Sequence, residues 1–139
     1  MPKRRRGSRS ARTLPRRLDR HQRFETLVDE ALATIPMPFA AALDEVAIVI
    51  ADEPSAAQLR DEGMRPDDTL YGLYEGVPRT DYGPDWVEVP NRITLFRLPL
   101  EADFPDPDEL ADEVWVTVVH ELAHHLGIDD DRLHELGVD

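Results

Sequence analysis

One segment, residues 106–127, constrains the fold of this chain more than any other. It begins with Asp106, Pro107 and Glu109, an order typical of a helix start in which Asp caps the first turn and Pro takes the first helical position. Apolar residues then recur at helical spacing, which predicts one packed face. Gly127 stands where helices commonly end in the left-handed conformation. We therefore expect a packed helix that runs to about residue 126.

The helical segments outside this helix are shorter. A leading helix is expected over residues 22–34, where apolar residues share one face and two prolines follow, with one more helical turn over 39–43. A final turn is expected over 131–136, closed by another glycine. Together with three strands between the helices, this order predicts a small α+β domain. The length of 139 residues argues for a single domain.

Three short runs favour β-strands. Residues 46–50 are continuous and β-branched, which indicates a buried strand. Residues 70–74 form the second candidate. Residues 92–98 alternate between polar and apolar side chains and are interpreted as a half-exposed third strand. The polar segments 52–68 and 80–91 are expected to be loops.

The long helix carries the pattern H-E-x-x-H, formed by His120, Glu121 and His124. Residues four apart in a helix differ by about 40° around its axis and about 6 Å along it, so both imidazoles can reach one cation. Glu121 is close enough to reach a water on that cation without displacing it. Zinc with two or three protein ligands keeps a position for such a water. The chain has no cysteine, so any metal must be held by His, Asp or Glu.

The residues after the helix supply a candidate third ligand. Gly127 tolerates a positive φ angle and allows a sharp turn. Asp130 then completes the pattern H-E-x-x-H-x-x-G-x-x-D, and the turn can bring its carboxylate under the end of the helix. Asp129 and Asp131 compete for this role, because spacing alone does not fix the geometry of a turn. The aspartates that are not ligands would cap the final turn, support the site or be solvated.

The extended motif resembles that of the metzincin zinc peptidases, with Asp in place of their usual third His. The chain is more similar to the mini-zincins, small bacterial zincin-like metallopeptidases of about this length. The likeness includes the leading helix, VAIVI followed by DEP, LYGLYEGVP, RITLFR and, as its specific part, HELAHHLGIDDDRLHELG. It implies an α+β zincin scaffold whose last long helix carries the active site. It also implies a zinc ion on His120, His124 and Asp130, with Glu121 as general base.

These residues predict a zinc metallopeptidase that hydrolyses a peptide or protein substrate. Glu121 would take a proton from a zinc-activated water as it attacks the carbonyl, and pass it to the leaving amine. An edge strand, expected to be 92–98, would pair with the extended peptide. The alternative is a non-catalytic metal-binding or interaction module with the same fold, suggested by the small size. A purely structural zinc fits less well, because it needs no neighbouring base and usually has four protein ligands.

Charge divides the chain into a basic arm, residues 1–20, and an acidic body, residues 21–139. The arm carries nine Lys or Arg and one Asp, a balance of +8, whereas the body carries seven Arg and 28 acids, a balance of -21. The arm lacks apolar periodicity, so we expect it to be disordered. We favour a solvated tail over a nucleic-acid contact, because the arm has no aromatic to stack on bases. In the alternative module, the arm would dock a polyanion.

No apolar run approaches the ~20 residues that span a bilayer, and no apolar signal core follows the basic start. A soluble, cytoplasmic protein without membrane contact is therefore expected. The sequence does not indicate an oligomeric state.

Other side chains near the motif have less specific interpretations. His125 lies 100° around the helix from His124 and is interpreted as exposed or partly packed. His134 is interpreted as a surface residue. Tyr71, Tyr74 and Tyr82 are candidates for a phenol that stabilises an oxyanion, although packing explains the first two at least as well.

Overall fold

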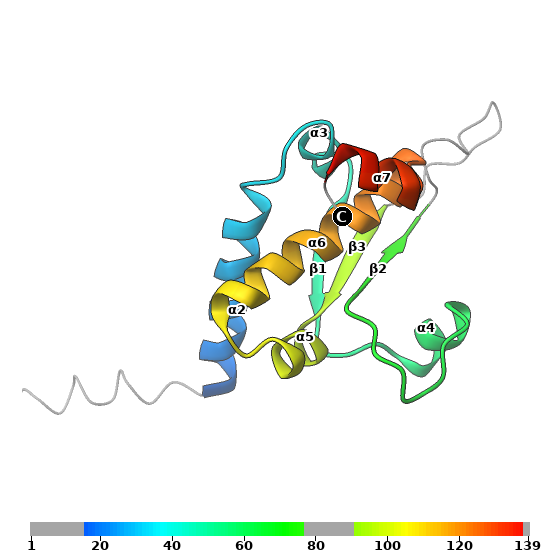
Figure 1. The fold of residues 1–139 in the computed structure, drawn as a ribbon. Helices are drawn as coiled ribbons and strands as arrows, with labels where there is room; N and C mark the ends of the chain where they lie inside the picture. The colour runs from blue at the N-terminus through cyan, green and yellow to red at the C-terminus, as the bar shows by residue number, and fades with distance from the viewer. Residues whose placement is uncertain (1–15, 77–90, 138–139) are drawn as a thin grey trace, which may run out of the picture.

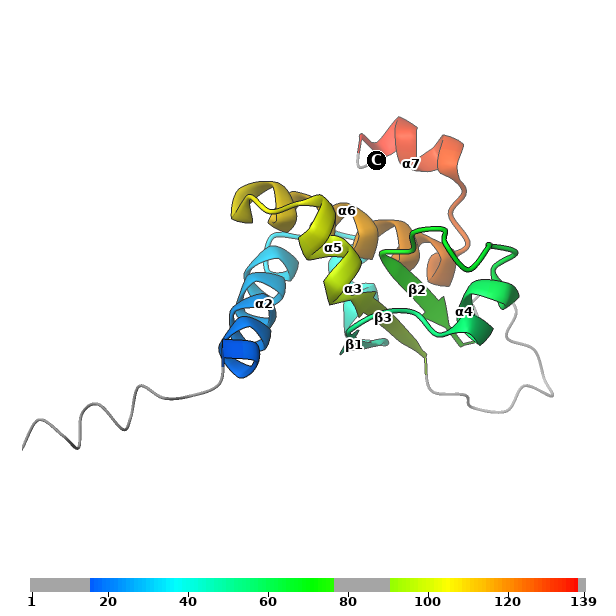
Figure 2. The ribbon, with the colours of Figure 1, turned by 90° about the horizontal axis from the view of Figure 1, so that it is seen from below.

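A three-stranded sheet lies at the centre of the computed structural model, which describes residues 16–76 and 91–137. The strands β1 (Ala47–Ala51), β2 (Gly72–Glu75) and β3 (Arg92–Phe96) follow the spatial order β1-β3-β2. The central strand β3 runs parallel to β1 and antiparallel to β2 (Figure 1). The long helix α6 (Pro107–Leu126) lies across one face of the sheet, as Figure 2 shows from below.

The other helices are arranged around α6 and the sheet. They are α2 (Arg16–Leu32), α3 (Phe39–Leu43), α4 (Ala56–Asp61), α5 (Arg97–Asp103) and α7 (Asp130–Leu136). Helices α2 and α3 both pack against α6, and α7 lies on the side of α6 that faces away from the sheet (Figure 2). The described residues thus form the small α+β domain that the sequence predicts. None of their helices combines the length and apolar character that a membrane crossing requires.

Helix α6 holds the core together because one of its faces is buried along its length. Asp106 caps its start by accepting a hydrogen bond from the Glu109 N–H at 3.1 Å, and Gly127 ends it at φ 72°, both as predicted. The buried face packs against α2 and the central strand. Its fully buried apolar members are Val114, Val118, Val119, Leu122 and Ala123. Removing this apolar area from water is the main free-energy gain that fixes α6 in place.

Two helix positions differ from the prediction. Helix α2 begins at Arg16 rather than near residue 22, so the end of the predicted arm is helical. An ion pair of i,i+4 spacing between Asp19 and Arg23, at 3.3 Å, supports this exposed part of the helix without burial. Helix α4 lies inside the segment predicted as a loop. The rest of the arm and the predicted loop 80–91, apart from its last residue, lie outside the described residues.

The sequence marks the start of α4 with a helix-capping pattern. Ser55 and Gln58 form a capping box, in which the Gln58 N–H donates to Ser55 Oγ at 3.0 Å and the Ser55 N–H donates to Gln58 Oε1 at 2.9 Å. The pattern S-x-x-Q marks such a start. It precedes only a short helix with one buried apolar residue, Leu59, so hydrophobic periodicity did not reveal it.

The predicted burial of two strands is also wrong. β1, predicted as buried, is an edge strand, and Val49 is 40 % exposed. β3, predicted as a half-exposed edge strand, is central, and Thr94 within it is only 5 % exposed. Alternation suggested exposure because Thr94 is polar, but β3 is paired with a strand on each of its edges. The strand also ends at Phe96, where α5 begins.

Arg97 explains why the chain leaves the sheet at this point. Its side chain is 6 % exposed and its guanidinium contacts Glu101 Oε1 at 2.7 Å and Asp52 Oδ1 at 3.2 Å. The Glu101 contact spans one turn of α5, and the Asp52 contact joins α5 to the residue after β1. A buried arginine is tolerated when carboxylates pair with it, so these contacts favour the helix start over a longer strand.

β2 lies unusually close to α6 at Gly72. A Cβ atom at this position would lie 2.6 Å from Thr117 Cγ2, on α6, and 3.4 Å from the Thr94 carbonyl oxygen. Threonine is β-branched and has few χ1 choices in a helix, so its methyl group cannot easily move aside. Glycine therefore allows the strand to rest directly on the helix.

We expect Gly72→Ala to lower the free energy of unfolding by about 1–3 kcal/mol, the usual cost of inserting a methyl group into a packed contact. Thr117→Ser removes the opposing methyl group, so the double variant should recover most of the loss. Urea unfolding of the parent, both single variants and the double variant measures this coupling. A double variant no more stable than Gly72→Ala alone would contradict the proposed contact.

Tyr71, the residue before β2, connects that strand to the end of α5. Its hydroxyl donates to Asp103 Oδ2 at 2.5 Å, and its ring meets the edge of Phe104 at a centroid distance of 5.6 Å. The hydrogen bond to Asp103, together with burial and the charges of Asp103 and Glu113, raises the pKa of Tyr71 to about 12. The neutral phenol is the form that this contact stabilises.

Asp103→Asn should therefore lower the pKa of Tyr71 towards the ordinary tyrosine value of about 10. Because the folded-state pKa is raised, the contact stabilises the parent below about pH 10 and this stabilisation is lost as pH rises through about 12. Titration of the tyrosine ring-carbon NMR signals gives the pKa of each residue, with Tyr71→Phe to assign the signal. Equal Tyr71 pKa values in the parent and Asp103→Asn would refute this account.

Candidate metal centre

The C-terminal half of α6 brings the two motif histidines together. His120 and His124 are one turn apart, with ring centroids separated by 5.7 Å and ring planes at 74°. Their side chains are 40 % and 54 % exposed, so both rings lie at the surface end of the helix rather than in the core. The arrangement is the one that i,i+4 spacing predicts.

The turn after α6 places Asp130 beside His120. Gly127 adopts φ 72°, and the Ile128 N–H donates to the Ala123 carbonyl at 2.8 Å, which reverses the chain tightly. α7 then begins at Asp130, whose Oδ1 lies 3.2 Å from His120 Nε2. The turn therefore delivers a carboxylate from outside the helix to the first motif histidine.

The two competing aspartates lie differently. Asp129 caps α7, because its Oδ1 accepts a hydrogen bond from the Arg132 N–H at 2.9 Å. Asp131 is exposed in the first turn of α7. Of the three aspartates, Asp130 is thus the one that an ion pair joins to a motif histidine.

The side chains of the motif and Asp130 form two pairs rather than one closed group. His120 contacts Asp130, whereas His124 Nδ1 lies 3.7 Å from Glu121 Oε1. Within residues 16–76 and 91–137, no three His, Asp or Glu side chains already surround one point as a metal site would require. Asp130 is 82 % exposed and His124 54 %, so both can reorient without disturbing the core. Two imidazoles and one carboxylate within reach of one another fit zinc by donor type.

Glu121 differs from its neighbours because it is largely buried. Its side chain is 15 % exposed, and its Oε1 accepts a hydrogen bond from the backbone N–H of Tyr74, on β2, at 2.8 Å. Burial raises the pKa of Glu121 above its ordinary value, while His124, the Tyr74 N–H and His120 act in the opposite direction. The carboxylate is therefore desolvated and held in one orientation by the sheet.

His125 is the main residue near the site that sequence interpretation missed. It is predicted to be exposed or partly packed, but its side chain is fully buried. Its Nε2 lies 2.7 Å from Glu45 Oε1, and its Nδ1 lies 2.9 Å from the Tyr74 hydroxyl. A signal existed in the sequence, since His125 follows the buried Val118 and Leu122 at the spacing of the apolar face.

The three candidate phenols have other roles or lie outside the described residues. The Tyr71 hydroxyl binds Asp103, and the Tyr74 hydroxyl lies 2.9 Å from His125 and 3.2 Å from Asn91 Oδ1. Tyr82 lies in the segment that is not described. His134 is exposed on α7, as predicted.

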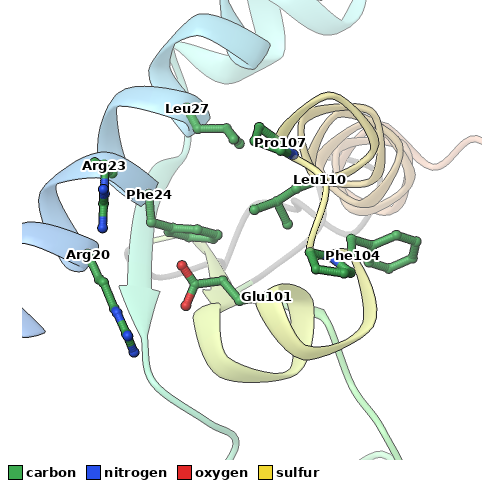
Figure 3. A pocket seen from close by; sticks show the side chains of 9 residues that line it. Arg20, Arg23, Phe24, Leu27, Glu101, Phe104, Pro107 and Leu110 are labelled. Carbon is green, nitrogen blue, oxygen red and sulfur yellow. The ribbon is translucent and has the colours of Figure 1, made fainter.

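A cavity of about 680 Å³ lies at the opposite end of α6 (Figure 3). It is lined by residues of α2, α5 and the start of α6, including Arg20, Arg23, Phe24, Glu101 and Leu110. Because the motif histidines lie near the C-terminal end of α6, this cavity is separate from the candidate metal centre.

Comparison with known proteins identifies the family of the chain. No curated protein matches it. A sequence model of the zincin-like metallopeptidases matches residues 43–138, from the end of α3 through α7. This match covers more than half of the chain and includes all three strands, the H-E-x-x-H helix, the Gly127 turn and Asp130. The family description indicates metal-dependent peptide hydrolysis, in general with zinc. The chain belongs to the zincin-like metallopeptidase family, as its resemblance to the mini-zincins predicts.

Proposed function

We propose that this chain is a zinc-dependent peptidase in which His120, His124 and Asp130 hold the metal and Glu121 is the general base. The observation that supports this most is the position of Glu121. Its desolvated carboxylate is fixed by the Tyr74 N–H at 2.8 Å and lies next to both histidines, 3.7 Å from His124. A carboxylate with no chemical role would be expected to remain solvated at this surface.

The chemistry divides between the metal and the side chains. When bound, zinc supplies Lewis acidity, which polarises the peptide carbonyl and makes a water easier to deprotonate. Glu121 takes the proton from the attacking water as its oxygen bonds to the carbonyl carbon. When the C–N bond breaks, Glu121 gives that proton to the leaving amine. Water and the peptide are thereby converted into a carboxylic acid and an amine, and Glu121 returns to its initial state.

The protein prepares Glu121 for both proton transfers. Burial raises its pKa, which makes the carboxylate a stronger base than a solvated glutamate. The Tyr74 N–H occupies Oε1, so the second oxygen is the one suited to exchange the proton. The two histidines act on the same pKa in the opposite direction to burial.

The peptide substrate is proposed to lie along β2 rather than along residues 92–98. The earlier expectation is wrong because β3 is central and both of its edges are occupied. β2 is the edge strand that packs against α6. The Tyr71 carbonyl accepts from the Phe96 N–H at 2.9 Å, so strand alternation directs the backbone groups of Gly72 and Tyr74 away from β3. The Tyr74 N–H donates to Glu121, so the Gly72 backbone groups and the Tyr74 carbonyl are the ones proposed to pair with the peptide. An extended peptide there would lie beside Glu121.

Metal analysis is the first test of the proposed ligands. The purified chain should contain about one zinc ion, as a single catalytic site requires. His120→Ala should lose the metal, and Asp130→Asn should weaken zinc binding at least about tenfold because it removes a charged donor. Asp131→Asn is the matched control on the same turn and should bind zinc as the parent does. Equal losses in the two asparagine variants would contradict the assignment of Asp130.

Glu121→Gln tests the base separately from the metal. It should retain zinc but lower kcat about 10²–10⁴-fold, the range attributed to a general base. Peptide-library cleavage by the zinc-loaded variant and parent provides the comparison. A variant that cleaves as fast as the parent would refute the mechanism. A parent that binds zinc but cleaves no peptide would instead favour the non-catalytic binding module.

A further inference from the structure

We propose that Glu45, His125 and Tyr74 form a hydrogen-bonded network, centred on the fully buried His125 ring, that positions the Glu121 carboxylate for catalysis. This inference rests on the proposed peptidase function, in which Glu121 is the base. The three side chains of this network make hydrogen bonds to one another and not to the substrate or to Glu121. They act through the Tyr74 backbone, and are therefore positioning residues.

The network joins three segments that are distant in sequence. Glu45 lies in the connection between α3 and β1, Tyr74 lies on β2, and His125 lies on α6. Both ring nitrogens of His125 are engaged, Nε2 with Glu45 Oε1 at 2.7 Å and Nδ1 with the Tyr74 hydroxyl at 2.9 Å. Nε2–H donates to the Glu45 carboxylate, and Nδ1 shares a hydrogen bond with the Tyr74 hydroxyl, which also donates to Asn91 Oδ1 at 3.2 Å.

Tyr74 is attached to two successive turns of α6. Its hydroxyl meets His125, and its backbone N–H donates to Glu121 at 2.8 Å, four residues earlier on the same helix. Two attachment points of this kind prevent β2 from sliding along α6 or rotating about its own axis. The Tyr74 N–H therefore keeps a fixed direction, and so does the carboxylate oxygen that accepts from it.

Simple packing does not account for this arrangement. The buried polar residues among those described are Thr94, Arg97 and His125, so His125 is the one on α6. An apolar side chain would fill the same site without the cost of desolvating an imidazole and part of a carboxylate. The network is located one turn from Glu121, where a small displacement of the strand would move the base.

The test uses the full-length, zinc-loaded chain and begins with Tyr74→Phe. This variant removes the hydroxyl but keeps the backbone N–H and the ring. It should lower kcat about tenfold or more with little change in KM, because the base is misplaced while the substrate still binds. Zinc affinity should stay at the parent value, because no proposed ligand is altered.

Hydrogen exchange provides a readout that does not depend on activity. The Tyr74 amide should exchange slowly in the parent because it donates to a buried carboxylate, and Glu121→Ala gives the unprotected reference. Tyr74→Phe should lower the protection of the residue-74 amide at least about tenfold relative to the β3 amides. His125→Leu should do the same, and His125→Asn, whose amide can replace Nδ1, should restore part of the protection.

Val114→Ala is the matched control for general loss of stability. It truncates a fully buried residue of α6 that lies about two turns before Glu121. It should destabilise the fold but leave kcat and the relative protection of the residue-74 amide unchanged.

Two results would overturn the inference. One is unchanged residue-74 protection in both Tyr74→Phe and His125→Leu, and the other is an equal loss of relative protection in Val114→Ala. Failure of the peptidase function is distinguishable from these results. A parent that binds zinc without cleaving peptides would remove the function, whereas amide protection would still show whether the network orients Glu121.

Discussion

The packing of β2 against α6 is the constraint on which the candidate site depends. Gly72 lets the strand approach the helix, because any side chain there would collide with the Thr117 methyl group. Two residues later, the strand can then reach α6 with both the backbone and the side chain of Tyr74. Moving the strand outward by the width of a methyl group would lengthen both contacts beyond hydrogen-bond distance.

The parts of the fold that local chemistry determines are predictable from sequence. Asp106, Pro107 and Gly127 mark both ends of α6, and the helix begins and ends where these residues indicate. Once the helix is predicted, its spacing alone places His120 and His124 one turn apart on the same side. Asp129 stands at the start of α7, where aspartate commonly caps a helix. Because its carboxylate caps α7, Asp129 has a different role from Asp130.

The parts that depend on distant contacts are not predictable in this way. Residues 92–96 become the central strand because they pair in parallel with β1, which precedes them by more than forty positions, and pair with β2 on their other side. Alternation cannot reveal a strand that is covered on both edges. The partners of His125 show the same limit, because Glu45 and Tyr74 are 80 and 51 positions away from it in the sequence.

The site combines exposed ligand candidates with a largely buried carboxylate, the proposed base Glu121, and the two depend on different parts of the fold. A bound metal ion would order its own ligands, so the exposed side chains of His124 and Asp130, the proposed ligands, need no fixed orientation beforehand. A general base receives no such help, and its carboxylate must already point towards the water before the reaction begins. The local turn at Gly127 is therefore sufficient to bring Asp130, the proposed third ligand, beside His120. Orienting Glu121 requires the strand, and two hydrogen bonds of α6, made by Glu121 and His125, converge on Tyr74.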